Sequence, residues 1–312
     1  MLYENLINRT TQILSHYLVG NPEFGEFSSK ADVDVCLRER IREILPVSGG
    51  LSQYGRRTIY LMKACLAGEK LIPGKEFYMM HESLHGVRDF SPEAYSKGHR
   101  EGFVQRHTYL ALIAARKAGE KIDCEDGYLW QLAAVNLFAG IIGHKVVTDS
   151  AKNGRPSKEL FEFFKQKAGT EGLESYRARM KHLQTAYDGP TNHFPNGVRQ
   201  GMDYMDAVTV NIIEDICAKI FHPVIQEMPK DVRETFAQKI SESYEPFLQL
   251  DLSQSGKDTL QRLSRAVQEN LRTACNRSVE ENRAFCAENR ARWIQLEADY
   301  KVKRFERTFN GR

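Results

Sequence analysis

Residues 128–147 read YLWQLAAVNLFAGIIGHKVV, the most apolar stretch of the chain. The stretch is long enough for a membrane-spanning helix, but Gln131, Asn136 and His144 interrupt it, and no second stretch of this kind occurs. Polar side chains at such positions are typical of a helix whose neighbours satisfy them. The stretch therefore predicts the central buried helix of a protein without a membrane span.

Helical spacing of apolar residues continues on both sides of this stretch. Further helices are expected over residues 6–18, 31–45, 51–67, 76–87, 92–118, 198–221, 231–244 and 257–307. In the helix that ends near Ala118, Gly98 and Gly102 weaken the start. Because strand-like alternation is scarce, the sequence predicts an all-α fold. A multi-helix bundle domain is expected over residues 1–250, and a long charged C-terminal helix over residues 251–312.

The composition is that of a globular protein, with 41% hydrophobic and 27% charged residues in 312. The net charge of +3 lies entirely in residues 276–312, which hold nine Lys or Arg against six Asp or Glu. A narrow apolar stripe on this charged segment suits a helix that packs along the domain or binds a partner protein. The small net charge by itself argues neither for nor against nucleic acid, and a nucleic-acid partner is not expected.

The six cysteines are scattered and include no Cys-x-x-Cys pair, so the sequence predicts free thiols in a reducing compartment. The N-terminal residues lack a basic region followed by an apolar run, which is the pattern of a signal peptide. The expected location is therefore the cytoplasm. Delivery into a host cell without a cleavable signal peptide is compatible with the same pattern.

The residues that indicate chemistry are His81-Glu82-Ser83-Leu84-His85. On a helix, imidazoles at positions i and i+4 lie on one face and can bind Zn²⁺, with Glu82 as a general base. A third ligand is then needed, and His99 and Glu101 are the candidates, with Glu101 preferred. Metallopeptidases of this pattern set the helix against a sheet whose edge strand binds the peptide. No such sheet is predicted here, so the zinc-dependent hydrolase is the alternative hypothesis.

The same segment, in the longer form Tyr78 to Arg88, carries His-x-x-x-His-x-x-Arg after an aromatic residue. This motif resembles the opening of the SidE-family phosphodiesterase domain of secreted bacterial effectors, an all-helical, HD-like fold. The resemblance is partial and some catalytic positions are altered. Glu82 replaces a glycine, and His144 follows Ala139-Gly140 where the family has a glutamate. Met202 follows Gln200-Gly201 where the family has a histidine.

The resemblance implies a phosphoester hydrolase of the phosphodiesterase type, or a degenerate relative that binds a nucleotide or a phosphorylated protein. His81 would then act as nucleophile or acid/base, with His85, Glu82 and His144 as further catalytic candidates. Substrate-binding candidates are Arg88, which would hold phosphate oxygens, His99 and Asp149. This hydrolase is the favoured hypothesis, and it requires no cofactor that the sequence identifies.

Two alternatives stay open beside it. One is the zinc-dependent, metallopeptidase-like hydrolase with His81, His85 and Glu101 as metal ligands. The other is a non-catalytic helical interaction protein, in which both histidines are structural and the C-terminal helix binds a partner. His144 lies near the end of the apolar helix, where the helix dipole favours its charged form.

Overall fold

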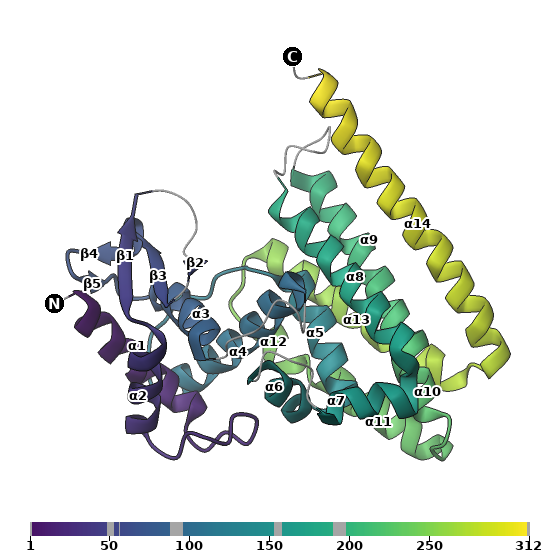
Figure 1. Cartoon of the computed structure of the whole chain (residues 1–312), viewed down its shortest axis with the longest axis horizontal. Coiled ribbons are helices and arrows are strands. Elements are labelled where there is room, and N and C mark those ends of the chain that lie inside the picture. Colours follow the sequence, from purple (N-terminus) through teal and green to yellow (C-terminus); the bar gives the residue numbers. More distant parts are fainter. Residues whose placement is uncertain are drawn as a thin grey trace.

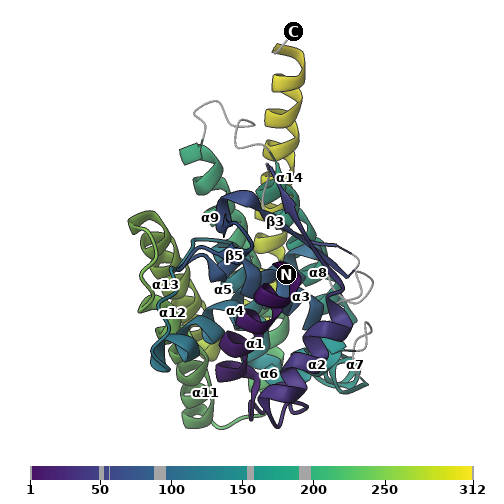
Figure 2. The same cartoon turned by 90° about the vertical axis from the view of Figure 1, so that its left-hand side faces the viewer.

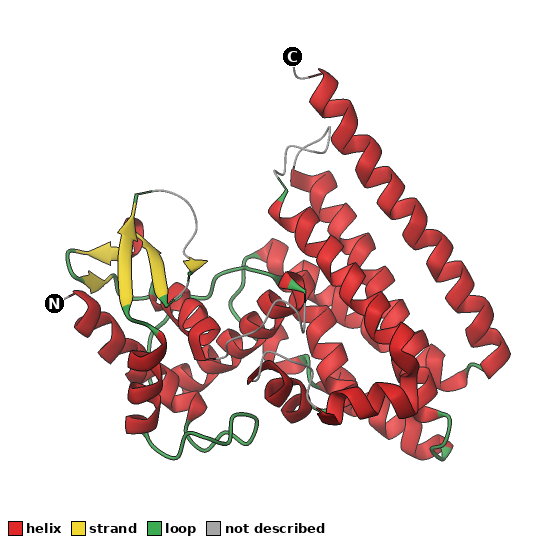
Figure 3. Cartoon of the chain, in the orientation of Figure 1, coloured by secondary structure: helices red, strands yellow, loops and turns green. Residues whose placement is uncertain are grey.

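The computed structural model describes residues 2–48, 53–55, 57–87, 96–152, 158–189 and 198–310. Helices dominate these residues, which confirms the predicted all-α, multi-helix fold (Figure 1). The strands are short and gather beside the N-terminal helices (Figure 3). Among the described residues, no single helix combines the length and the apolar composition of a membrane span, although the sharply bent pair Leu129–Ile142 and His144–Ser150 does so together.

The N-terminal third places two helices and a three-stranded sheet against a third helix, and a separate pair of short strands lies beside the first helix. Its elements are α1 (Leu2–Leu18), α2 (Lys30–Arg40), β1 (Glu43–Val47), β2 (Gln53–Tyr54), β3 (Thr58–Met62), the 3-10 helix η1 (Lys63–Cys65), β4 (Leu66–Ala67), β5 (Lys70–Leu71) and α3 (Glu76–Val87). One sheet has the order β1-β3-β2, with β1 parallel and β2 antiparallel to β3; β4 and β5 form a separate pair.

The predicted helices over 31–45 and 51–67 are therefore wrong in part. The first ends at Arg40 and is followed by β1, and the second is replaced by β2, β3, η1 and β4. In β3 the side chains of Ile59 and Leu61 are buried while their neighbours are half-buried, which is the alternation of a strand. Pro46 lies in β1, an edge strand of this sheet, where its missing N–H is tolerated.

The remaining helices form the larger part of the molecule. They are α4 (Lys97–Lys117), α5 (Leu129–Ile142), α6 (His144–Lys152), α7 (Lys158–Phe163), the π-helical η2 (Phe164–Ala168), α8 (Gly169–Asp188), α9 (Val198–Ile216), the π-helical η4 (Cys217–Phe221), α10 (His222–Ile225), α11 (Lys230–Glu242), α12 (Glu245–Leu248), α13 (Gln254–Asn276) and α14 (Val279–Asn310). The single helix predicted over 257–307 is thus two helices, α13 and α14, separated at Arg277 and Ser278.

Helices α4 and α5 form the centre of the molecule and contact each other extensively. As predicted, α5 is buried along nearly its whole length. A Cβ atom on Gly102 would lie 2.5 Å from the backbone oxygen of Gln131, so this glycine lets α4 approach α5 closely. Gly98 likewise lets α4 approach α8 closely, because a Cβ atom there would collide with the backbone oxygen of Met180. The two glycines that weaken the helix start in the sequence are the ones that fix its position.

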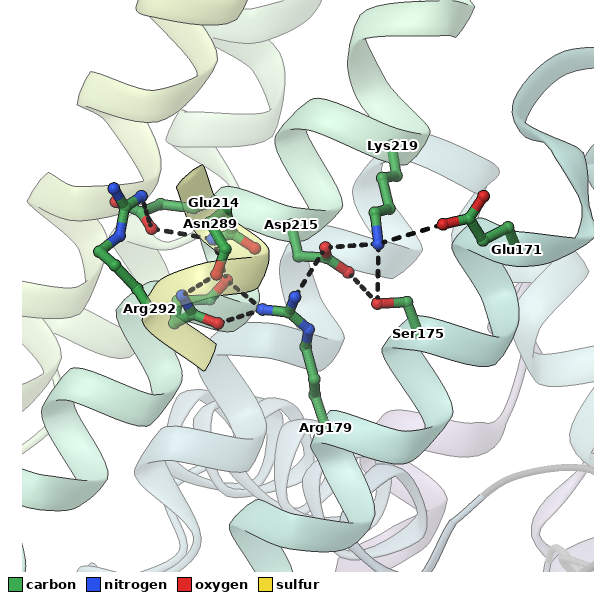
Figure 4. Close-up of polar contacts among 9 residues, drawn as sticks. Glu171, Ser175, Arg179, Glu214, Asp215, Lys219, Asn289 and Arg292 are labelled. Carbon is green, nitrogen blue, oxygen red and sulfur yellow. Dashed lines mark hydrogen bonds and ion pairs between the residues drawn. The ribbon is translucent and has the colours of Figure 1, made fainter. Parts of the chain in front are cut away.

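Helix α14 packs against α9 and runs along the side of the molecule (Figures 1 and 2). A buried polar network holds it there (Figure 4). The guanidinium of Arg179 in α8 lies 3.1 Å from the carboxylate of Asp215 in α9 and stacks over the ring of Trp293 in α14. From α14, the side chain of Asn289 donates to the backbone oxygen of Asn211 over 3.1 Å. Removing one partner would leave a buried polar group unpaired, so the network favours a single position for α14.

Candidate metal centre

Helix α3 brings the two histidines of the pentad together, as the i, i+4 spacing predicts. The ring centroids of His81 and His85 lie 5.0 Å apart, and the ring planes are nearly perpendicular. Both residues are buried, with 6% and 8% of their surface exposed. Met79, Met80, Leu84 and Val87 around them are buried as well. The two imidazoles therefore lie together in a nearly dry environment.

Helix α4 adds a carboxylate to the pair. The Oε2 atom of Glu101 lies 3.1 Å from Nε2 of His85 and 3.6 Å from Nε2 of His81. Glu101 is itself only 5% exposed. Because Gly102 allows α4 to lie against α5, the neighbouring Glu101 is held at a fixed depth beside α3. Of the two predicted third ligands, the structure brings Glu101 to the histidines.

Opposite charges stabilise one another across this cluster. Burial acts to raise the pKa of Glu101, but His85 and His81 outweigh it and hold that pKa well below its usual range. Burial acts to lower the pKa of His81, yet the hydrogen bond that His81 donates to Glu101 and the charge of Glu82 give a net rise. A buried carboxylate with two imidazoles against it is therefore stable only if a cation or a proton lies among them.

The donor atoms suit a divalent metal ion. One atom from each of His81, His85 and Glu101 lies within 4.8 Å of the other two. Ligands about 2.1 Å from a tetrahedral zinc ion are about 3.4 Å apart, close to the distances that Glu101 makes with the histidines. Two imidazoles and one carboxylate are also the three protein ligands of a known class of catalytic zinc site. The residues present therefore fit zinc.

A hydroxyl on α4 lies behind His81. Nε2 of His81 faces Glu101, while its Nδ1 lies 3.5 Å from Oγ1 of Thr108, a long contact. Thr108 donates its only hydroxyl proton to the backbone oxygen of Val104 over 2.8 Å, so it can only accept from His81. With a metal ion at Nε2, His81 would be neutral, and an acceptor at Nδ1 would favour the tautomer with hydrogen there and leave the Nε2 lone pair for the metal.

Tyr128, which sequence reasoning did not select, covers His81. The two rings stack with centroids 5.5 Å apart and planes 9° apart. Tyr128 has a left-handed backbone, with φ 49° and ψ 30°, just before α5 begins. A residue other than glycine in this conformation is uncommon and is often found where function requires it. The only sequence signal was its place at the start of the apolar stretch.

The other predicted site residues lie apart from this cluster. His99 is fully buried, and its Nδ1 lies 2.6 Å from the hydroxyl of Tyr176. Burial and the charge of Arg177 lower the pKa of His99 to about 3, so it is a neutral core residue. Asp149 forms an ion pair with Lys145 one turn earlier on α6. Arg88 lies outside the described residues.

His144 differs from its prediction in position and in charge. It is not near the end of a continuous helix, because α5 ends at Ile142 and His144 begins α6. Gly143, with φ of 109°, makes this break. Burial, with Arg106 nearby, lowers the pKa of His144 to about 4, whereas a charged form was expected. The charged groups that affect it are Arg106 and Glu23, not those of the cluster formed by His81, His85 and Glu101.

No protein-family model matches this sequence, and no curated protein or solved structure matches it. The chemistry of the site is therefore inferred from its geometry.

Proposed function

We propose that this protein is a zinc-dependent hydrolase. His81, His85 and Glu101 would hold the metal ion, and Glu82 would act as the general base. The observation that carries the proposal is the approach of the Glu101 carboxylate to both histidines, from a separate helix and at 3.1 and 3.6 Å. The spacing of the pentad alone does not require such a ligand. The Glu101 carboxylate completes a set of three protein donors and would leave the other coordination positions of the metal for water and substrate.

The charge of the cluster favours a cation over a phosphate group. Glu101 faces the histidines, and the charge of Glu82 is close enough to affect the pKa of His81. Two buried carboxylates repel an anionic ligand and attract a divalent cation. The SidE-like phosphodiesterase stays a prediction. Its expected substrate-binding Arg88 lies outside the described residues, and its expected catalytic His144 lies beside Arg106 and Glu23.

The residues of the site would divide the reaction among them. A bound zinc ion would act as a Lewis acid that polarises the substrate carbonyl and makes water more acidic. Glu82, 5% exposed, would accept a proton from the attacking water at its carboxylate. The same carboxylate would then pass the proton to the leaving nitrogen. Tyr128 stacks on one face of the His81 ring and keeps water from that face.

A small sheet beside α3 favours a peptide as the substrate. The sequence predicted no such sheet, and its absence was the objection to a metallopeptidase. In the sheet as described, β2 is an antiparallel edge strand that contacts α3. An edge strand can pair with an extended peptide through backbone hydrogen bonds. The sheet thus removes the objection and supports a peptide-bond hydrolase.

Turnover by the full-length chain tests this function. Metal-free and zinc-loaded protein are each given quenched fluorescent peptides and bis(p-nitrophenyl) phosphate. Zinc-loaded protein should cleave peptides, and Glu82→Gln should keep its zinc but lose about 10²- to 10⁴-fold in turnover. Glu76→Gln is the matched control, because Glu76 is a buried carboxylate on the same helix whose partner is Arg9. Peptide cleavage that needs no zinc, or equal turnover by Glu82→Gln, would overturn the proposal. Cleavage of the phosphodiester alone would support the phosphodiesterase prediction.

A further inference from the structure

A cavity of about 190 Å³ is lined by Tyr128, the residue whose ring stacks on His81. The loop before α5, the end of α8, α9 and the first turns of α13 enclose it. It is lined by Asp126, Gly127, Tyr128, Leu129, Trp130, Tyr187, Met202, Ser255, Gly256 and Thr259. Asp126 and Ser255 are exposed, so solvent reaches the cavity from their side. The volume is many times that needed for one water molecule.

Aromatic rings join this cavity to the metal-binding histidines. Tyr128 stacks on His81 with one face, and its ring centroid lies 4.8 Å from that of Tyr187. Trp130 lies next, with its centroid 6.3 Å from that of Tyr187. The wall of the cavity is therefore one ring away from His81. In a bound peptide, neighbouring Cα atoms are 3.8 Å apart, which is comparable to the width of one ring. A residue next to the bond that reacts near His81 could therefore place its side chain in the cavity.

The charged groups at the cavity already have partners. The carboxylate of Asp126 accepts a hydrogen bond from the backbone of Ser253 over 3.0 Å, and another from the Ser253 hydroxyl. Asp206 accepts from the indole nitrogen of Trp130 over 2.7 Å and pairs with Arg262. The rest of the lining carries no charge: it consists of three aromatic rings, Leu129, the thioether of Met202, two glycines and the hydroxyl residues Ser255 and Thr259. Such a cavity selects a ligand by shape and aromatic character, not by charge.

We propose that this cavity binds an aromatic side chain of the peptide substrate. The inference rests on the proposed hydrolase function and names the substrate feature that the enzyme would select. Tyr128 is then the element that the two sites share, because its ring stacks on His81 and also lines the cavity. Its fixed, left-handed backbone holds the ring in that position.

Binding to metal-free protein tests the cavity without catalysis. The probes are N-acetyl-phenylalanine amide, N-acetyl-alanine amide and N-acetyl-lysine amide, followed by the fluorescence of Trp130 in a Trp293→Phe background, with calorimetry on the unmodified chain. The phenylalanine probe should bind with Kd on the order of millimolar, because a ligand this small gains little free energy. The alanine and lysine probes should bind at least tenfold more weakly. Equal binding of the three probes, or no binding of the phenylalanine probe, would overturn the proposal.

A variant that fills the cavity provides a second test of the proposal. The hydroxyl of Ser255 approaches Sδ of Met202 at 4.0 Å, so Ser255→Phe places a ring into the cavity from an exposed position. Gln254→Phe, at the adjacent exposed position whose side chain bonds Asp258, is the matched control. Ser255→Phe should lose at least tenfold in affinity for the phenylalanine probe, and Gln254→Phe should not. Unchanged binding by Ser255→Phe would contradict the location.

The peptide assay separates this inference from the function on which it rests. Zinc-loaded wild type should prefer peptides that contain Phe over the same peptides with Ala, and Ser255→Phe should abolish that preference without loss of zinc. Zinc-dependent cleavage that is indifferent to aromatic residues would overturn the substrate class and leave the hydrolase standing. No cleavage of any peptide, with the phenylalanine probe still bound, would overturn the hydrolase and the substrate assignment, and would leave only an aromatic-binding cavity.

Discussion

Oε2 of Glu101 lies 3.1 Å from Nε2 of His85, although the two residues come from different helices and Glu101 is 16 positions further along the chain. Both side chains are buried, so the packing of the protein sets the distance between them. The contact depends on how closely α3 and α4 approach each other. It turns a two-histidine motif into a cluster with three candidate metal ligands.

Replacing Glu101 by Gln keeps the size of the side chain and removes its charge. The affinity for zinc should fall by about two orders of magnitude or more, because a charged ligand to the metal is lost. A competitive titration with a chromophoric chelator measures this. Glu174→Gln, at an exposed position on α8, is the control and should bind zinc like the wild type. Equal zinc affinity for Glu101→Gln and wild type would exclude Glu101 as a ligand.

Thr108 is expected to orient His81 from behind. Thr108→Val keeps the shape of the side chain and removes the acceptor at 3.5 Å from Nδ1. Zinc affinity should fall by about 10- to 100-fold, as when other outer partners of metal-binding histidines are removed. Thr108→Ser, which restores the hydroxyl, should recover most of it. If Val and Ser at this position bind zinc equally well, Thr108 has only a packing role.

Gly102 is expected to be necessary for the packing of α4 on α5. In Gly102→Ala the new Cβ would lie 2.5 Å from the backbone oxygen of Gln131, so the helices must separate. Urea unfolding should show a loss of about 1–3 kcal/mol. Gly127→Ala is the control, since a Cβ there meets nothing closer than 3.7 Å. A Gly102→Ala protein as stable as the control would show that the close approach is not needed.

His144 should make stability depend on pH. Its pKa falls from 6.5 to about 4 on folding, mainly through burial, so between these values the unfolded chain binds a proton that the folded chain does not. Its contribution is complete above pH 6.5 and is lost as pH falls toward 4. Between these limits the free energy of unfolding should rise with pH in the wild type. In His144→Gln the slope should be smaller, and the two slopes should differ by up to about 1.4 kcal/mol per pH unit.

Urea unfolding at several pH values measures this slope. His16→Gln, at an exposed position on α1, is the control and should keep the slope of the wild type. A His144→Gln protein with the wild-type slope would mean that His144 titrates alike in both states.

The fold class could be predicted because helical periodicity is a local property. The stretch 128–147 was identified as the central helix, and only Gly143, with its positive φ, divides it. The small sheet was missed because Thr58–Met62 is too short for its alternation to stand out among helical segments. Its pairing with Glu43–Val47 depends on residues distant in the sequence.

The site could be predicted only as far as one helix reaches. His81, Glu82 and His85 follow from spacing on a single turn. Choosing between His99 and Glu101 required the orientation of α4: residues two apart on a helix point about 200° apart, so only one of them can face α3. Tyr128 and Thr108 reach His81 from 47 and 27 positions away, and nothing local marks such contacts.

Zinc bound per chain is the most direct test of the central claim. Full-length protein is stripped with a chelator, dialysed against buffered zinc and analysed for metal, with His81→Ala/His85→Ala as the reference. About one zinc should bind per wild-type chain, and the double variant should not retain it. Less than about 0.1 zinc per wild-type chain, or equal zinc in both proteins, would contradict it.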